Sequence, residues 1–127
     1  MHERPDALEL ITAVREFLSE HAMNELEGRT RFHARVAVNA LGIVERELTL
    51  RGPACEREAA RLRDLLGTEG ELDEQVAELS KRIRSGELAD DDEALLEHLW
   101  STALDKLAID QPGYAAYQRA LEQREKR

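Results

Sequence analysis

The sequence predicts an all-α protein, an antiparallel bundle of five to six helices around a central apolar helix at about residues 30–50. Apolar residues recur at spacings of three and four in one segment after another, which is the period of an amphipathic helix. No segment shows the sustained alternation of apolar and polar residues that indicates a strand. With 127 residues, the chain is expected to form a single helical domain over residues 1–127.

The segment from Thr30 to Leu50 is apolar on almost every side when placed on a helix at about 100° per residue. Two apolar stripes cover most of it: Phe32, Val36, Ala40 and Ile43, and then Ala37, Leu41, Val44 and Leu48. The remaining narrow polar wedge consists of Arg35, Asn39, Gly42 and Arg46. Because a helix of this kind belongs in the interior of a bundle, we expect its neighbours to surround it.

Glycine and proline residues mark where the other predicted helices begin and end. The first helix is expected to open at Pro5 and Asp6 and to end at Gly28, and the apolar segment to end at residues 51–53. Pro53 would then lie in the first turn of a third helix that ends at Gly67.

Three further helices follow in the prediction. The fourth carries apolar residues at positions 72, 76, 79 and 83 and stops at residues 85–86. The acidic run 90–93 caps the start of the fifth, residues 111–113 end it, and residues 114–121 form a short sixth helix. Short connections of this kind favour antiparallel neighbours.

Composition excludes several classes of function. A net charge of −9 and an aromatic content of 4% disfavour binding to nucleic acid, which normally needs a basic surface and stacking platforms. The same charge disfavours anionic membranes, and the longest uncharged run, residues 36–44, is too short to span a bilayer. Cys55 is the only cysteine, so neither an intramolecular disulfide nor a thiolate metal site is expected. We expect a cytoplasmic protein.

Two histidines are candidates for chemistry. His21 and His33 both fall within apolar arcs of their helices, and Glu25 lies one turn after His21. Such groups could converge as an acid–base pair or as metal ligands. The chain has no Glu-x-x-His or His-x-x-x-His spacing, however, so a structural role is the more common outcome and no metal is expected.

The polar wedge offers a second candidate site. Arg35, Asn39 and Arg46 could hold one anionic ligand, and Arg31 extends the basic surface toward the preceding turn. The alternative is that these arginines pair with carboxylates of neighbouring helices, such as Glu16, Glu20 or Glu97, and this structural pairing is the favoured interpretation.

A resemblance to a family covers most of the chain. The segments RPDALELITAVREFL, RFHARVAVNALGIVEREL, KRIRSGEL and LDKLAIDQPGY resemble those of a family of small all-helical bacterial proteins of unknown function. Its members are often encoded beside aminoglycoside-phosphotransferase-like kinases and acyl-CoA dehydrogenases. The resemblance implies an accessory role in an acyl-CoA or kinase-like pathway, and it supplies no catalytic residues.

Three functions therefore remain open. The first is a helical accessory protein, without catalytic residues or a cofactor, that binds a neighbouring kinase-like enzyme or acyl-CoA dehydrogenase. The second is a small-molecule binding protein or enzyme that holds a CoA phosphate or a carboxylate at Arg35, Asn39 and Arg46, with His33 or His21 as the acid–base group. The third is self-association as a homodimer.

Overall fold

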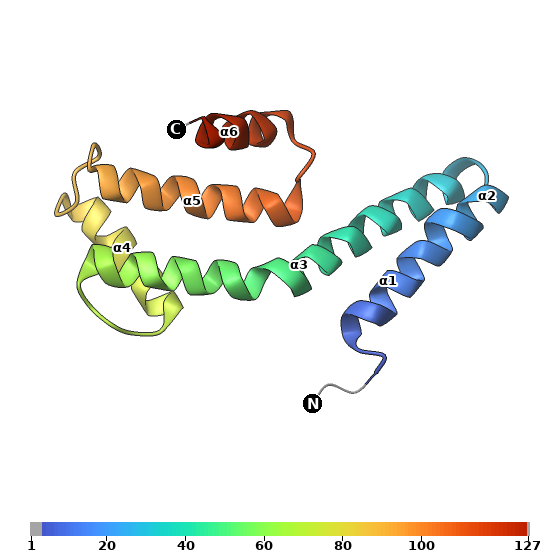
Figure 1. Cartoon of the computed structure of the whole chain (residues 1–127), viewed down its shortest axis with the longest axis horizontal. Coiled ribbons are helices and arrows are strands. Elements are labelled where there is room, and N and C mark those ends of the chain that lie inside the picture. The colour runs from blue at the N-terminus through green and yellow to red at the C-terminus, as the bar shows by residue number, and fades with distance from the viewer. Residues whose placement is uncertain (1–3, 127) are drawn as a thin grey trace. The chain divides into compact units, whose positions relative to one another are not determined.

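The computed structural model describes residues 4–126, and every regular element in this range is helical (Figure 1). The predicted all-α class is therefore confirmed. The chain divides into two compact units, residues 1–50 and residues 51–127. Helix α3, Gly28–Leu66, contributes its first part to one unit and the remainder to the other.

The N-terminal unit is a helical hairpin. Its first arm runs through α1 (Ala7–Phe17), one turn of π-helix η1 (Leu18–Ala22) and α2 (Met23–Glu25). Asp6 caps the start of this arm, because its carboxylate accepts a hydrogen bond of 2.9 Å from the backbone N–H of Glu9. Leu26 is extended and Gly28 has a φ of 60°, a conformation that favours glycine, and α3 begins there.

The two arms of the hairpin run antiparallel (Figure 1). The hydroxyl of Thr12 donates a hydrogen bond of 2.9 Å to the Glu45 carboxylate, which also accepts from the guanidinium of Arg15. At the turn, Arg31 Nη1 donates to the carbonyl oxygen of Met23 at 2.9 Å. These contacts fix the register, since residues 12 and 15 lie beside 45 and residue 23 lies beside 31.

Helix α3 continues through residues 51–53, so the predicted helix end at this point is wrong. The structure has one helix of 39 residues with Pro53 inside it. Proline has no N–H and cannot donate to the carbonyl of Thr49, a loss that usually ends or kinks a helix. Here the helix continues on both sides of Gly52 and Pro53, and the boundary between the two units falls beside this weak point.

The C-terminal unit has its own core. The second part of α3 packs with α4 (Leu72–Ser85) and α5 (Glu93–Asp110), and their buried leucines form one cluster. This cluster consists of Leu62, Leu66, Leu79 and Leu95, with Leu65, Leu72, Ile83 and Leu88 packed against it. Helix α6 (Ala115–Glu125) then packs on α5, to which Arg124 is joined by an ion pair with Glu97.

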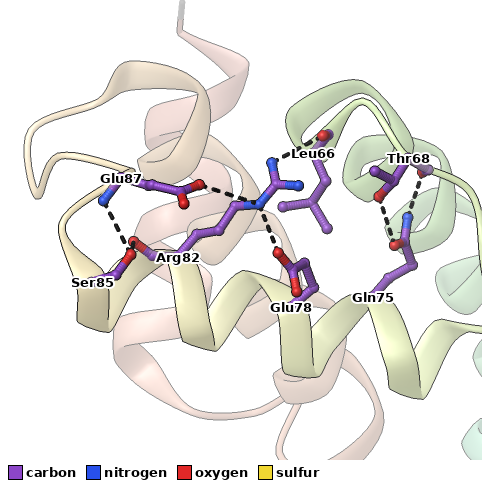
Figure 2. A network of polar contacts seen from close by, with 7 residues as sticks. All are labelled: Leu66, Thr68, Gln75, Glu78, Arg82, Ser85 and Glu87. Atoms are coloured by element: carbon purple, nitrogen blue, oxygen red, sulfur yellow. Dashed lines mark hydrogen bonds and ion pairs between the residues drawn. The ribbon is translucent and has the colours of Figure 1, made fainter.

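A polar network joins the end of α3 to α4 (Figure 2). Arg82 donates from Nη1 to the carbonyl oxygen of Leu66 at 2.9 Å and forms an ion pair with Glu78 at 3.0 Å. The buried Gln75 donates from Nε2 to the carbonyl oxygen of Thr68 at 2.7 Å and accepts from the Thr68 hydroxyl at 3.0 Å. Side chains of α4 thus satisfy carbonyl groups that the end of α3 leaves without partners.

The expectation that residues 30–50 are surrounded by their own chain is wrong. Among them only Ala34 is buried, whereas Phe32 is 63% and Leu48 50% exposed. Leu41 is half-buried, and Val44 is 39% exposed. The helix has the wide apolar arc that the sequence predicts, but the other arm of the hairpin covers only one side of it.

In the described part of the chain, no helix is both long enough and apolar enough to cross a membrane.

The leucine cluster predicts which substitutions weaken the C-terminal unit. We expect Leu62→Ala to lower the free energy of unfolding by about 2–5 kcal/mol, because the fully buried Leu62 side chain leaves a cavity when truncated. Val76→Ala on α4 is the control, since this valine is 39% exposed and its truncation should cost less than about 1 kcal/mol. Urea unfolding followed by circular dichroism measures both values, and equal losses would contradict the assignment of the core.

Candidate functional site

The polar wedge lies on a solvated side of α3. Arg35 and Asn39 are exposed, and within residues 4–126 neither side chain makes a hydrogen bond or an ion pair. Arg46 is half-buried, and its Nη1 atom lies 3.2 Å from the place that a side chain at Gly42 would occupy. The glycine therefore leaves room for the guanidinium of Arg46 itself.

A shallow hollow lies beside Arg46. Its volume is about 330 Å³, and its lining consists of Leu8, Thr12, Glu45, Arg46, Thr49 and Leu50. The hydrogen bond from Arg15 and a second from Thr12 hold the pKa of Glu45 below its usual value, so the hollow contains a carboxylate charge. Neither Arg35 nor Asn39 lines this hollow.

The two candidate histidines are exposed and lie against aromatic rings of their own helices. The rings of His21 and Phe17 have centroids 6.3 Å apart, and those of His33 and Phe32 are 5.6 Å apart, edge to face. Among the described residues, no group of three or more histidine, cysteine or acidic side chains is placed to hold a metal ion. Arg31, the last of the predicted site residues, is engaged with the carbonyl of Met23 at the turn.

Several large apolar side chains are exposed on the hairpin. Eight of them are 38–63% exposed, namely Leu10, Val14, Phe17, Phe32, Val36, Val44, Leu48 and Leu50. Completing their burial would contribute roughly 6–12 kcal/mol, at half of the usual value for each large apolar side chain.

Helical geometry divides the exposed apolar residues of α3 between two sides of the helix. At about 100° per residue, Phe32 and Leu50 lie within about 20° of Asn39 in the polar wedge. Val44 and Leu48 lie about 140–180° from Asn39, on the opposite side of α3.

A groove lined by both apolar and charged residues lies between α5 and α6. Its groove has a volume of about 560 Å³ and is lined by Glu93, Leu96, Glu97, Trp100, Ala120, Gln123 and Arg124. Leu96 and Trp100 are each 49% exposed, and the adjacent Leu99 is 44% exposed. Charged groups also line the groove. Arg124 pairs with Glu97 and donates a hydrogen bond of 3.2 Å to the Ser101 hydroxyl.

A buried polar clamp holds α5 against α3 in the C-terminal unit. Arg61 Nε donates to Nδ1 of His98 at 3.1 Å, and Arg61 Nη2 donates to the hydroxyl of Thr102 at 3.1 Å. His98 is only 4% exposed. Burial, together with the nearby charge of Arg61, lowers the pKa of His98 below its usual value. A neutral ring with an unprotonated Nδ1 is the form that accepts this hydrogen bond.

His98, Arg61 and Arg124 are not among the residues that the sequence predicts for a site. A signal for His98 was present, because residues 95, 98 and 102 share a face of α5 on which Leu95 is buried. For Arg61 and Arg124 no comparable signal exists, since charged residues on helices usually face solvent. The groove beside Arg124 depends on where α6 packs, which the spacing of apolar residues leaves undetermined.

Taken together, the fold and its surfaces define a small all-helical protein with exposed apolar side chains in both of its units. The family model for DUF6285, a domain of unknown function, matches residues 24–114. This is more than half of the chain, and the chain therefore belongs to that family. Searches of curated proteins and of solved structures gave no match.

The clamp predicts how stability depends on pH. Because the pKa of His98 is lower in the folded state than in the unfolded chain, the unfolded state binds the proton more readily. Stability should therefore fall as the pH drops through the ordinary titration range of histidine, about 6.5. We expect His98→Asn, which retains an acceptor for Arg61, to reduce this loss when melting temperatures are compared at about pH 7.5 and 5.5.

Thr102→Val is the matched control for this experiment. It removes the other hydrogen bond of Arg61 without removing a titratable group, so it should cost about 1 kcal/mol at both pH values. A His98→Asn variant that loses as much stability on acidification as the wild type would contradict a neutral, buried His98.

Proposed function

We propose that the protein acts by binding another protein, as a helical accessory protein, and that the groove between α5 and α6 receives the partner. The observation that carries this proposal is the exposure of Leu96 and Trp100 at the edge of a hollow of about 560 Å³. Tryptophan and arginine are the residues most enriched among those that dominate binding energy at protein interfaces. Both line this groove, as Trp100 and Arg124.

The chemistry of the groove indicates the kind of partner. Its apolar centre suits one large apolar side chain, and Glu93 and Glu97 lie at its sides. The acidic run Asp90–Asp92 directly precedes Glu93 in the sequence, and only one lining carboxylate, Glu97, is paired with Arg124. A partner segment that presents an apolar anchor flanked by lysine or arginine would be complementary in both shape and charge.

The partner we favour is an enzyme encoded beside genes of this family, an acyl-CoA dehydrogenase or an aminoglycoside-phosphotransferase-like kinase. This choice follows from the resemblance described above. The alternative, an anionic ligand held by Arg35, Asn39 and Arg46, has less support because Arg35 and Asn39 do not line the hollow beside Arg46. It stays a prediction that thermal-shift measurements with acyl-CoAs and nucleotides test.

Co-expression with each neighbouring enzyme, followed by size-exclusion chromatography and calorimetry, tests the proposal. We expect one of the two enzymes to form a complex at micromolar concentrations. Trp100→Ala should weaken it by roughly 30-fold or more, because truncating a central aromatic anchor costs about 2 kcal/mol or more.

Tyr114→Ala supplies the matched control. Tyr114 is a 47% exposed aromatic residue of the same unit, and it does not line the groove. Its truncation should leave the affinity within a factor of about three. The proposal fails if neither enzyme binds, or if the Trp100 variant binds as tightly as the wild type.

A further inference from the structure

We propose that α6 is a movable wall of the α5–α6 groove, which docks on α5 and leaves it again while α3, α4 and α5 stay folded. The inference deepens the proposed function and rests on it for one consequence, that a partner in the groove stabilises the docked position of α6. Three features of the structure carry it: a core built without α6, a short docking seam, and an open space between α5 and α6.

The core of the C-terminal unit is built without α6. Its buried leucines come from α3, α4 and α5, and among the described residues no side chain packed against them belongs to α6. Within α6, all of whose residues the structure describes, Ala120 is the one buried side chain. An alanine brings a single methyl group, which is far less apolar area than a buried leucine. The leucine cluster therefore stays covered when α6 leaves.

The seam by which α6 docks on α5 is short. Its residues at positions 116, 117, 120, 121 and 124 are buried or half-buried, and this spacing places them on one face of the helix over little more than two turns. A helix of 11 residues is too short to be stable in water without packing against a neighbour. Docking of α6 and formation of its helix therefore occur together.

Arg124 holds the far end of this seam. It forms an ion pair with Glu97 and donates to the Ser101 hydroxyl at 3.2 Å, so its guanidinium spans one turn of α5 (the two helices are antiparallel, Figure 1). The Glu97 side chain is 58% exposed. Because ion pairs in contact with water contribute little and are screened by salt, this contact is weak enough to open.

The groove shows that α6 is incompletely packed on α5. Its volume is about 560 Å³, and it is lined by Leu96 and Trp100 from α5 and by Ala120 and Gln123 from α6. Closely packed helices leave no space of this size between them. A partner side chain that fills it would contact both helices. Binding of the partner would then shift the equilibrium of α6 toward the docked position.

Hydrogen exchange of backbone amides, followed by mass spectrometry on the full chain, measures the movement without a partner. We expect the amides of α6 to exchange at least about 100-fold faster than those of α5 at residues 95–104, because α6 opens locally and α5 opens only with its unit. Trp100 is the only tryptophan of the chain and lines the groove, so its emission reports the same event. In urea this emission should change before α5 loses its protection.

A substitution in the seam produces the undocked state. Ala120→Glu places a carboxylate at the buried position of α6, in the groove that Glu93 and Glu97 also line. We expect it to abolish the protection of α6 and to leave the exchange of residues 95–104 within a factor of about three. Ala115→Glu is the matched control, since this alanine is exposed on the same helix and its substitution should leave α6 protected.

Arg124→Met tests the ion pair. It should speed the exchange of α6 by about two- to fivefold, as expected for an exposed pair, and leave α5 unchanged. Salt at about 1 M should speed the exchange of α6 in the wild type and have no such effect in this variant. Arg119→Met is the control, because Arg119 is exposed on the same helix and has no ion pair among the described residues.

Three outcomes would overturn the inference. In the first, α6 and α5 are equally protected in the wild type and lose protection at one urea concentration. In the second, Ala120→Glu removes the protection of α5 together with that of α6. In the third, a bound partner enzyme at 100 times its Kd leaves α6 unchanged, where the coupling predicts about 100-fold more protection. If neither enzyme binds, the proposed function fails and the first two measurements still decide whether α6 moves.

Discussion

One constraint governs the N-terminal unit: the apolar arc of α3 is wider than a single neighbouring helix can cover. The first part of α3 is apolar over most of its circumference, and α1 covers only one side of it. Burial of apolar area is the main favourable term in folding, so a surface of this size is costly to leave in water. The residues Leu10, Val14 and Phe17 of α1 are likewise more than half exposed, so the hairpin buries little apolar area between its two arms.

In the C-terminal unit, helices of the same chain cover the apolar side of α3. Its part of α3 is covered by α4 and α5, and Leu62 at the centre has no exposed surface. Polar groups of this unit find hydrogen-bond partners within the unit, since Arg61 donates to His98 and Arg82 donates to the carbonyl oxygen of Leu66. Such pairs fix the order and orientation of helices, because a buried polar group without its partner costs more than the bond contributes. What stays exposed is the face of α5 around Trp100.

Much of the helical content could be predicted, because it depends on the spacing of apolar residues and on capping residues close together in the sequence. The starts at Asp6 and in the acidic run 90–93 are confirmed, and in each case one aspartate caps the helix, Asp6 and Asp92. The prediction that the helix ends before Pro53 is wrong, because a proline removes one hydrogen bond and crowds the preceding turn but does not always end a helix. Among the candidate site residues, the exposure of Arg35 and Asn39 follows from the predicted wedge, whereas their separation from Arg46 and its hollow does not.

By itself, the sequence determined the helical class, the approximate ends of most helices and which side of each helix is apolar. These properties arise from residues within a few turns of one another, where the helical period fixes which side chains share a face. Only the tertiary structure decided which apolar sides find a neighbour, which polar groups meet and where hollows form. Those outcomes depend on contacts between residues far apart in the chain, such as Glu45 with Thr12 or Arg61 with His98, and no local spacing encodes them.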